Sequence, residues 1–497
     1  MKKTLIILFL LLSGANGYGQ GYNHQWLLGS YNFFQDPKGR ILFDSGNYSL
    51  INENRKMVFK GTQANISDVN GNLLMASNGI WIANATGDTM MNGGGLNPGG
   101  ITSNWPNGLP MTANNIFLSF SNDTNKFMLF HHTANFDGYS YPTNHIYLSE
   151  IDISLDNGKG SVTNKNQIIL SDTLNWGLAA CKHANGSDWW VIITKHNTDS
   201  TFIVNTSSTG IQYISSQKLN VPKSWYGVIQ PVFSNSGNQF AYFVYDSSTV
   251  NSTVLLFDFN RCNGTFSNPK IIPTTFGELI WGLAFSPSGK YIYACSSSSI
   301  FQIDTDNLSV DTVATYDGFV SPVGSSCCAT TFWNMYLAAN GKIYVTSGSG
   351  VQHIHEINYP DSAGIACDVQ QHAIDLGYAQ LRSVPNHPNY YLGCDTTLGC
   401  PCLTTGIEEH GSHEFRFNVA PNPNSGKFKI TYLLPQNHPG QLEVFDINGR
   451  RIYEMNLPPW STMQEVYLPK SITSGVYNCV ITSGGERGNK KVVVYKE

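Results

Sequence analysis

A single hairpin pattern recurs six times along this chain of 497 residues. Each copy has a strand-like run, a polar turn and an aromatic-rich run, as in Ser286-Pro-Ser-Gly289-Lys-Tyr-Ile-Tyr. The turn residues are Gly71, Asn125, Gly186, Gly237, Gly289 and Gly341, at intervals of 54, 61, 51, 52 and 52 residues. A period near 52, which holds about four strands, is typical of the blades of a β-propeller.

Two pieces of chain lie outside the six copies, one from about His24 and one that ends near Asn389. Together they amount to about one more blade, and a propeller commonly closes by building one blade from both ends of the chain. We therefore predict an all-β fold with a seven-bladed propeller, and six blades as the alternative. No window shows sustained helical spacing of apolar residues, which agrees with this fold class.

The last eighty or so residues form a separate pattern of short alternating strands. Turn signals divide these strands at Pro421–Ser425, Asp446–Gly449 and Ser474-Gly475. The pattern predicts a small immunoglobulin-like β-sandwich that follows the propeller.

This tail resembles, along its whole length, the type A C-terminal sorting domain of the type IX secretion system of Bacteroidetes. The resemblance rests on four motifs in the right order at the C-terminus: Pro421, Asn422, Pro423 and Asn424 with Gly426; Asp446 with Gly449; Gly475 with Tyr477; and the run that starts at Lys491. It implies two partners, the type IX translocon and its sorting-domain protease. It also implies a product that passes through the periplasm and is secreted or attached to the outer-membrane surface.

The repeats resemble, more loosely, a propeller group of secreted Bacteroidetes proteins. The matching stretches are Ile66–Leu74, Ile80-Trp81, Leu178–Ile192 and Val384-Pro-Asn. This resemblance covers about residues 25–390 and implies a fold and a compartment, but no catalytic residue.

The N-terminus agrees with export. Lys2 and Lys3 precede the apolar run Leu5–Leu12, and small residues follow, which is typical of a signal peptide that is cut between Gly17 and Gly21. No second stretch is apolar over the length that a transmembrane helix needs. We expect a signal peptide at 1–20, the propeller at 21–393, a linker at 394–413 and the sorting domain at 414–497.

The charge distribution disfavours nucleic acid as a partner. The mature part before residue 414 has 17 Lys and Arg against 27 Asp and Glu, a net charge of −10, whereas the tail has 10 against 7. Phosphate contacts supply most of the affinity for nucleic acid, and an acidic domain without a basic stripe cannot make them.

Ten cysteines in an exported chain favour disulfides. Cys394, Cys400 and Cys402 predict one pair among themselves, and the adjacent Cys327 and Cys328 have Cys295 or Cys367 as candidate partners. The Cys-Pro-Cys spacing is not that of a zinc site, so we expect no metal and no cofactor.

Motifs for catalysis are absent, including nucleophile elbows, metalloprotease helices and phosphate loops, so no catalytic residue is predicted. His353 and His355 share one strand face and could hold a metal with a third ligand. A hydrogen-bonded or solvent-facing pair is the preferred interpretation.

Tryptophans recur just before the first strand of several repeats, at intervals of 49, 56 and 52 residues. Equivalent positions would surround the mouth of the central channel, where aromatic rings suit stacking on sugars or on peptide aromatics. The alternative is that they wedge between blades as core. The predicted ligand-binding candidates are Trp176, Trp225, Tyr226, Trp281 and Trp333.

The function predicted from these features is a secreted or cell-surface binding module that recognises a glycan or protein. A hydrolase or lyase that acts on polysaccharide or peptide is the alternative, because propeller enzymes draw residues from several blades. The Gly- and Pro-rich stretch 87–113 is a further candidate binding loop, or an insertion without a role.

Overall fold

The structure is a computed structural model. It describes residues 21–496 except 31–36, 45–46, 136–141, 224–229, 247–250, 274–277, 323–327, 383, 403–416, 433, 435–438, 448, 459–462 and 485. The contacts divide the chain into two compact units, Met1–Leu403 and Thr404–Glu497, and each is described by itself.

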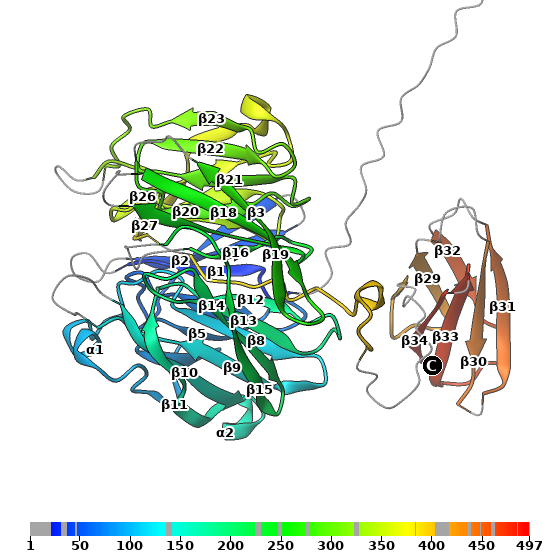
Figure 1. Cartoon of the computed structure of the whole chain (residues 1–497). Helices are drawn as coiled ribbons and strands as arrows, with labels where there is room; N and C mark the ends of the chain where they lie inside the picture. The colour runs from blue at the N-terminus through cyan, green and yellow to red at the C-terminus, as the bar shows by residue number, and fades with distance from the viewer. Residues whose placement is uncertain are drawn as a thin grey trace, which may run out of the picture. The chain divides into compact units, whose positions relative to one another are not determined.

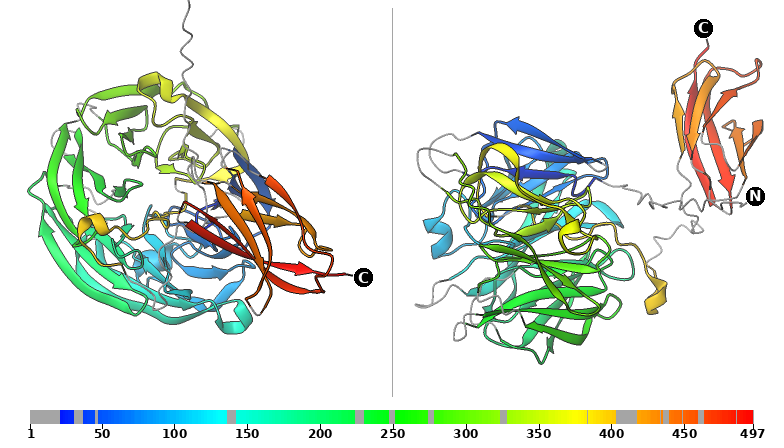
Figure 2. Two further views of the ribbon diagram at one scale, coloured as in Figure 1. Left: turned by 90° about the vertical axis from the view of Figure 1, so that its right-hand side faces the viewer. Right: turned by 90° about the horizontal axis from the view of Figure 1, so that it is seen from above.

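The first unit is a β-propeller whose described residues form seven consecutive antiparallel meanders around a central channel (Figures 1 and 2). The second and third meanders join at their outermost strands, through a parallel pairing of Ser161 with Met91, into one eight-stranded sheet. Blade 1 has β1 (Gln25–Leu28), β2 (Lys38–Asp44) and β3 (Asn47–Glu53); blade 2 has β4 (Ala64–Ser67), β5 (Leu73–Ser77), β6 (Trp81–Asn84) and β7 (Thr89–Gly94); blade 3 has β8 (Asn115–Phe120), β9 (Asp123–His131), β10 (Thr143–Asp152) and β11 (Ser161–Leu174). Blade 4 has β12 (Ala179–Lys182), β13 (Trp189–Thr194), β14 (Ser200–Ser207) and β15 (Gly210–Lys218); blade 5 has β16 (Val232–Phe233), β17 (Gln239–Asp246), β18 (Asn251–Asn260) and β19 (Thr265–Pro273). Blade 6 has β20 (Gly282–Phe285), β21 (Tyr291–Cys295), β22 (Ser299–Asp304) and β23 (Val310–Thr315); blade 7 has β24 (Met335–Leu337), β25 (Ile343–Val345), β26 (Val351–Ile357) and β27 (Val369–Gln380).

The turn after the innermost strand has the same geometry in five blades, and it explains the repeat in the sequence. Its glycine has a positive φ between 72° and 86°, where a side chain is strained. The glycine N–H donates to the carbonyl three residues earlier at 2.9–3.0 Å. These glycines are Gly71, Gly186, Gly237, Gly289 and Gly341. Asn125 is different, because it lies inside β9 and the turn of blade 3 falls before Asp123.

The prediction that one blade combines strands from both ends of the chain is wrong. Blade 1 consists of three N-terminal strands and blade 7 of four C-terminal strands in the described part of the chain. The seam between them is closed by hydrogen bonds from Ser30 N to Ala379 O (2.8 Å) and from Gly29 N to Gln380 Oε1 (2.7 Å).

Amide side chains connect the innermost strands, which do not pair with one another as a sheet. Asn65 Nδ2 donates to Gln25 O at 2.9 Å, and Gln230 Nε2 donates to Met335 O at 2.7 Å. Backbone groups buried without a partner are costly, so these amides satisfy strand edges that the propeller geometry leaves open.

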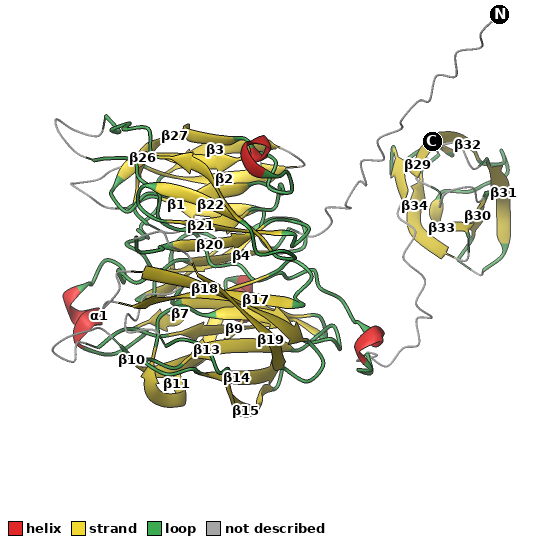
Figure 3. Cartoon of the chain, turned by 45° about the horizontal axis from the view of Figure 1, so that its top comes forward, coloured by secondary structure: helices red, strands yellow, loops and turns green. Residues whose placement is uncertain are grey.

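The Gly- and Pro-rich stretch 87–113 is packed against the propeller. It contains β7 and the short helix α1 (Gly100–Asn104), and its buried Leu109 and Met111 contact the partly buried Trp176. The other helical segments are also short, so the all-β class is confirmed (Figure 3): α2 (Leu155–Gly158), η1 (Gly364–Cys367) and η2 (Thr396–Leu398). No helix among the residues that the structure describes has the length and apolar character to cross a membrane.

The second unit is a small β-sandwich of two sheets, with strand orders β28-β29-β32 and β31-β30-β33-β34. Alternate residues of both sheets form one apolar core around Phe428, Leu442 and Ile481. The strands are β28 (Phe417–Ala420), β29 (Lys427–Tyr432), β30 (Gly440–Phe445), β31 (Arg451–Leu457), β32 (Met463–Tyr467), β33 (Gly475–Ser483) and β34 (Glu486–Val494).

Candidate functional site

The central channel of the propeller contains a segment of the chain itself. Residues 384–392, which we name the channel segment, run from the end of the channel where the innermost strands start to the end where they turn. Asn386 N donates to Gln63 O (3.2 Å), His387 Nε2 to Asn65 O (2.6 Å) and Tyr390 Oη to Phe117 O (2.9 Å). At the far end Asn389 Nδ2 donates to Asn235 Oδ1 (2.8 Å), in a turn of blade 5.

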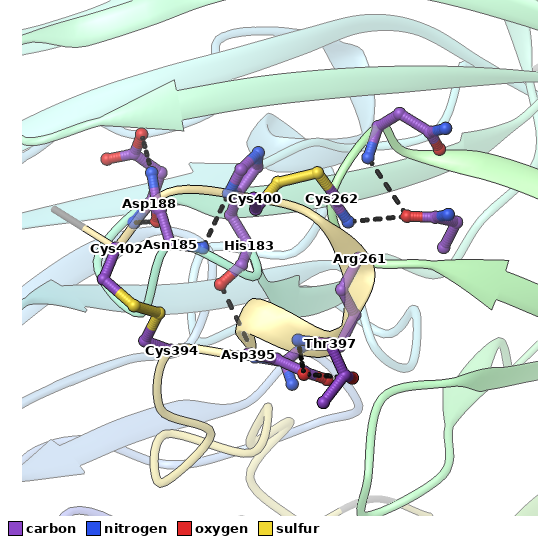
Figure 4. The surroundings of a disulfide bond; sticks show 12 residues. His183, Asn185, Asp188, Arg261, Cys262, Cys394, Asp395, Thr397, Cys400 and Cys402 are labelled. Atoms are coloured by element: carbon purple, nitrogen blue, oxygen red, sulfur yellow. Dashed lines mark hydrogen bonds between the residues drawn. A yellow bond between two sulfur atoms is a disulfide. The ribbon is translucent and has the colours of Figure 1, made fainter.

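Two disulfides fix the chain where it leaves the channel (Figure 4). Cys394 bonds to Cys402, which confirms the predicted pair, and Cys400 bonds to Cys262 in the turn between β18 and β19. The backbone also attaches here, since Asp395 N donates to Ala184 O at 2.8 Å. The part of the predicted linker before residue 403 is therefore joined to blades 4 and 5.

The proposed pairing of Cys295 or Cys367 with the adjacent cysteines is wrong. Both are free and buried, and burial raises the pKa of each thiol. Cys328 is disulfide-bonded, and Cys327 lies outside the described residues.

A cavity of about 610 Å³ remains in the channel beside this segment. Apolar and small side chains of β16, β20 and β24 form its walls, including Val232, Phe285 and Leu337. Polar side chains gather toward the turns of the innermost strands, where His24, Asn235, Ser288, Asp361 and Asn389 line it. Apolar walls with a few convergent polar groups are typical of ligand pockets.

The structure brings together two of the five predicted ligand-binding residues. The rings of Trp281 and Trp333 are stacked, with centroids 3.7 Å apart and planes at 16°. Both are partly buried and lie just before β20 and β24. The guanidinium of Arg382 lies over the ring of Trp333, 5.4 Å from its centroid, and was not singled out by the sequence.

Of the other three candidates, only Trp176 lies among the described residues. Trp176 is partly buried against Leu109, Met111 and Ala134. Trp225 and Tyr226 lie outside the described residues. Whether the tryptophans form one binding ring therefore stays a prediction.

One group of side chains has the geometry of a catalytic triad but no access to solvent. Ser149 Oγ lies 2.8 Å from His131 Nε2, and His131 Nδ1 lies 2.8 Å from Asn97 Oδ1. All three side chains are fully buried. Burial also lowers the pKa of His131 to about 3, so this group serves as a polar part of the core.

The histidine pair in β26 is divided between two environments. His353 is partly buried, and its Nδ1 shares a hydrogen bond of 3.2 Å with Ser321 Oγ. His355 is fully buried, and its Nδ1 accepts a hydrogen bond from His372 N at 3.0 Å. Burial lowers the pKa of His355 to about 4. Within the described ranges, no three His, Cys, Asp or Glu side chains are grouped to hold a metal ion.

The motif residues of the tail hold its sandwich together. Asn422 donates to Lys491 O (2.9 Å) and accepts from Val493 N (2.7 Å), so the Pro-Asn-Pro-Asn turn is tied to the last strand. Asn424 Oδ1 accepts from Gly426 N (2.8 Å). Asp446 closes the turn at Gly449, which has a φ of 77°, and Tyr477 Oη donates to Thr473 O at 2.8 Å.

A family model supports this assignment of the tail. Residues 418–495 match the model of the secretion system C-terminal sorting domain. The chain is thus a β-propeller protein with a type IX secretion sorting domain. This domain indicates export by that system, with the product secreted or on the cell surface.

Solved structures give distant similarities. A putative 6-phosphogluconolactonase from Bacteroides fragilis is 12% identical with a TM-score of 0.37, over 67% of this chain and 90% of that chain. TolB from Acinetobacter baumannii is 12% identical with a TM-score of 0.30, over 73% and 82%. Hsv2 from Kluyveromyces lactis is 9% identical with a TM-score of 0.35, over 73% and 99%. Such scores carry no argument about activity, and no curated protein matches the chain.

Proposed function

We propose that this protein is an exported binding module that recognises an extracellular glycan or protein, in the manner of an adhesin, through the cavity in its central channel. The cavity is the observation that carries the proposal. Its volume is about 610 Å³, which falls within the range that is usual for ligand pockets. We also propose that the protein comes from a member of the Bacteroidetes, as the resemblance of its tail implies.

The chemistry of the lining supports binding over catalysis. The titratable side chains that line the cavity include His24, Asp361 and His387. His387 donates to Asn65 O and burial lowers the pKa of its imidazole to about 4, so it is held neutral as part of the channel segment. Asp361 accepts from Ser288 N at 3.1 Å. Amides and hydroxyls supply other polar groups, and they suit hydrogen bonding to a neutral ligand.

The channel segment makes the cavity a preformed site. It forms part of the wall through Asn386, Asn389 and Tyr391 and is fixed beyond them by the disulfides at Cys394 and Cys400. A wall that is already ordered costs little entropy when a ligand binds.

The test is a glycan and peptide array probed with the mature chain, followed by titration of each hit against two variants. Ser288→Trp places a large side chain at an exposed position of the lining and should abolish binding. Thr209→Trp is the matched control, because Thr209 is exposed in the outer turn between β14 and β15 and does not line the cavity. Equal binding by both variants would show that the ligand does not use the cavity.

A further inference from the structure

The innermost strands of blades 5, 6 and 7 turn backbone groups into the channel. β16, β20 and β24 each pair with one neighbouring strand only, so the other edge of each strand faces the channel. Ser234 N, Ser286 N and Ala338 N donate across to the second arm of their hairpins at 2.8–2.9 Å. Hydrogen-bonded and non-hydrogen-bonded positions alternate along an antiparallel ladder, so the residue before each of these has its N–H and C=O on the channel side. These residues are Phe233, Phe285 and Leu337.

The backbone groups of Phe233, Phe285 and Leu337 have no hydrogen-bond partner among the residues that the structure describes. The equivalent positions of blades 2 and 4 are different. In blade 2, Ser67 N donates to Tyr22 O at 3.1 Å. In blade 4, Lys182 O accepts from Arg261 Nε at 2.9 Å. Blades 5, 6 and 7 therefore leave three donors and three acceptors on one side of the channel.

These backbone groups lie at the cavity. Phe233, Phe285 and Leu337 all line it, and they come from three successive blades, so their peptide groups surround one space. The lining residues Ser288 and Asp361 are exposed at the end where the innermost strands turn, so the cavity is open to solvent there. Backbone groups removed from water need a partner, which a ligand that enters from this end can supply.

The arrangement does not suit an added peptide strand. A peptide strand pairs with a continuous row of N–H and C=O groups along one edge. Gln230 interrupts this row in β20 and β24, because its Oε1 accepts from Leu283 N (3.2 Å) and its Nε2 donates to Met335 O (2.7 Å). Pro231, just before β16, has no N–H to offer. Each strand thus presents one free residue at the same level, which suits a compact ligand with several hydrogen-bonding groups.

The charge of the lining disfavours an anionic ligand. No lysine or arginine lines the cavity in the described part of the chain. Asp361 places a carboxylate at the opening, where it accepts from Ser288 N at 3.1 Å. A second carboxylate would be repelled there and would have no cation to pair with. A hydroxyl, in contrast, can donate to the carboxylate of Asp361.

We propose that the cavity takes a neutral sugar, the terminal unit of a glycan, whose hydroxyls bond to the peptide groups of Phe233, Phe285 and Leu337. Each peptide group offers one donor beside one acceptor. The adjacent hydroxyls of a sugar ring match this pattern, because every hydroxyl both donates and accepts. The inference rests on the proposed function, since it names the ligand class of the same cavity.

The experiment is calorimetric titration of the mature chain with three sets of probes. The first set is trisaccharides that end in glucose, galactose or mannose, the second is the same trisaccharides ending in the corresponding uronic acid, and the third is trialanine. We expect at least one neutral trisaccharide to bind. Its affinity should exceed that of its uronic acid counterpart and that of trialanine by at least about tenfold.

A pair of variants at Leu337 tests the backbone contact. Leu337→Pro removes the N–H that faces the channel and leaves the ladder with β25 intact, because this N–H takes no part in the ladder. Leu337→Ala removes the same side chain but keeps the N–H, so it is the matched control. Leu337→Pro should bind the neutral trisaccharide about three- to tenfold more weakly than Leu337→Ala, at a similar Tm.

Asp361→Asn tests the charge without touching a strand. The variant keeps an acceptor for Ser288 N at an exposed position. It should bring the affinity for the uronic acid counterpart to within about threefold of that for the neutral trisaccharide, with an unchanged Tm. This readout decides the matter if Leu337→Pro does not fold.

Three results would each overturn the sugar assignment: tighter binding of a uronic acid or of trialanine, equal affinity of the two Leu337 variants at equal Tm, or an unchanged preference in Asp361→Asn. If Ser288→Trp still abolished the binding of whichever probe was preferred, the proposed function would stand without the sugar. Binding by no probe, or binding that Ser288→Trp leaves unchanged, would overturn both.

Discussion

The buried histidines make the propeller sensitive to acid. In the first unit His131, His132 and His355 are fully buried and His387 is partly buried in the channel, and removal from water lowers their pKa values to about 3, 3, 4 and 4. In the unfolded chain each imidazole titrates near about 6.5. Between these values the unfolded state binds protons that the folded state excludes, so the free energy of unfolding falls as the pH is lowered from about 6.5 toward 4.

The size of the effect follows from the pKa differences. Each buried imidazole costs about 2 kcal/mol of stability when the pH falls from about 7.5 to 5, because one pH unit corresponds to about 1.4 kcal/mol per proton. Four such groups together cost about 8 kcal/mol, which is comparable with the whole stability of a typical domain, about 5–15 kcal/mol. We therefore expect the propeller to unfold near pH 5 in mild denaturant.

Urea unfolding of the mature chain at pH 7.5, 6 and 5 measures this slope. Tryptophan fluorescence reports mainly on the first unit, because nine of the ten tryptophans precede residue 404. In His387→Asn, which keeps a donor in the channel segment, the slope should fall by about a quarter. A free energy of unfolding that is constant from pH 7.5 to 5, or a variant slope equal to that of the wild type, would refute the reasoning.

Four other outcomes follow from the structure. A chain truncated at about residue 410 lacks the sorting domain and should accumulate in the periplasm, whereas normal levels in the medium, measured by immunoblot, would contradict that role of the tail. Replacing Cys262 and Cys400 by Ser opens a loop with a sequence separation of 138 and should lower stability by about 5 kcal/mol in a denaturant titration; an unchanged midpoint would show that the channel segment holds without the bond. Gly237→Ala should lower the Tm, because the residue has a φ of 72° and its Cβ would lie 2.5 Å from Cys181 Sγ; Gly210→Ala, which also has a positive φ (117°) but open space around its Cβ, should lower the Tm less and so isolates the effect of the contact. Limited proteolysis should cut the chain after Cys402 and leave an all-β fragment that still contains the Cys394–Cys402 disulfide. Mass spectrometry of the fragments identifies the cut, and a cut before Cys394 would contradict this prediction.

The blades were predictable because one local interaction repeats. The turn after the innermost strand needs a residue with a positive φ, so glycine occurs at this position in each of the five blades that have the turn. Blade 3 escaped the pattern at Asn125 because its turn is shorter and uses no glycine. The tail was predictable for a similar reason, since Asn422, Asp446 and Tyr477 each satisfy backbone groups within their own sandwich.

The candidate sites were predictable only in part. The spacing of Trp281 and Trp333 follows from the blade period, so the sequence indicated that they occupy equivalent places. The sequence did not predict that Arg382 lies over Trp333, because its position depends on how the chain turns after β27, and no local sequence pattern indicates that turn. The channel segment escaped for the same reason, because its contacts with Gln63, Asn65 and Phe117 join residues that are hundreds of positions apart in the sequence.

The disulfide between Cys262 and Cys400 also decides how the propeller bears tension. A force applied to the chain beyond Cys402 reaches the turn between β18 and β19 in blade 5 before it reaches the last strand of blade 7. Blade 7 is therefore not peeled away from its edge, and the seam between the first and last blades is shielded from the pull. A propeller held to a surface through its C-terminal end would resist shear flow in this way, even though none of the described strands is shared across its seam.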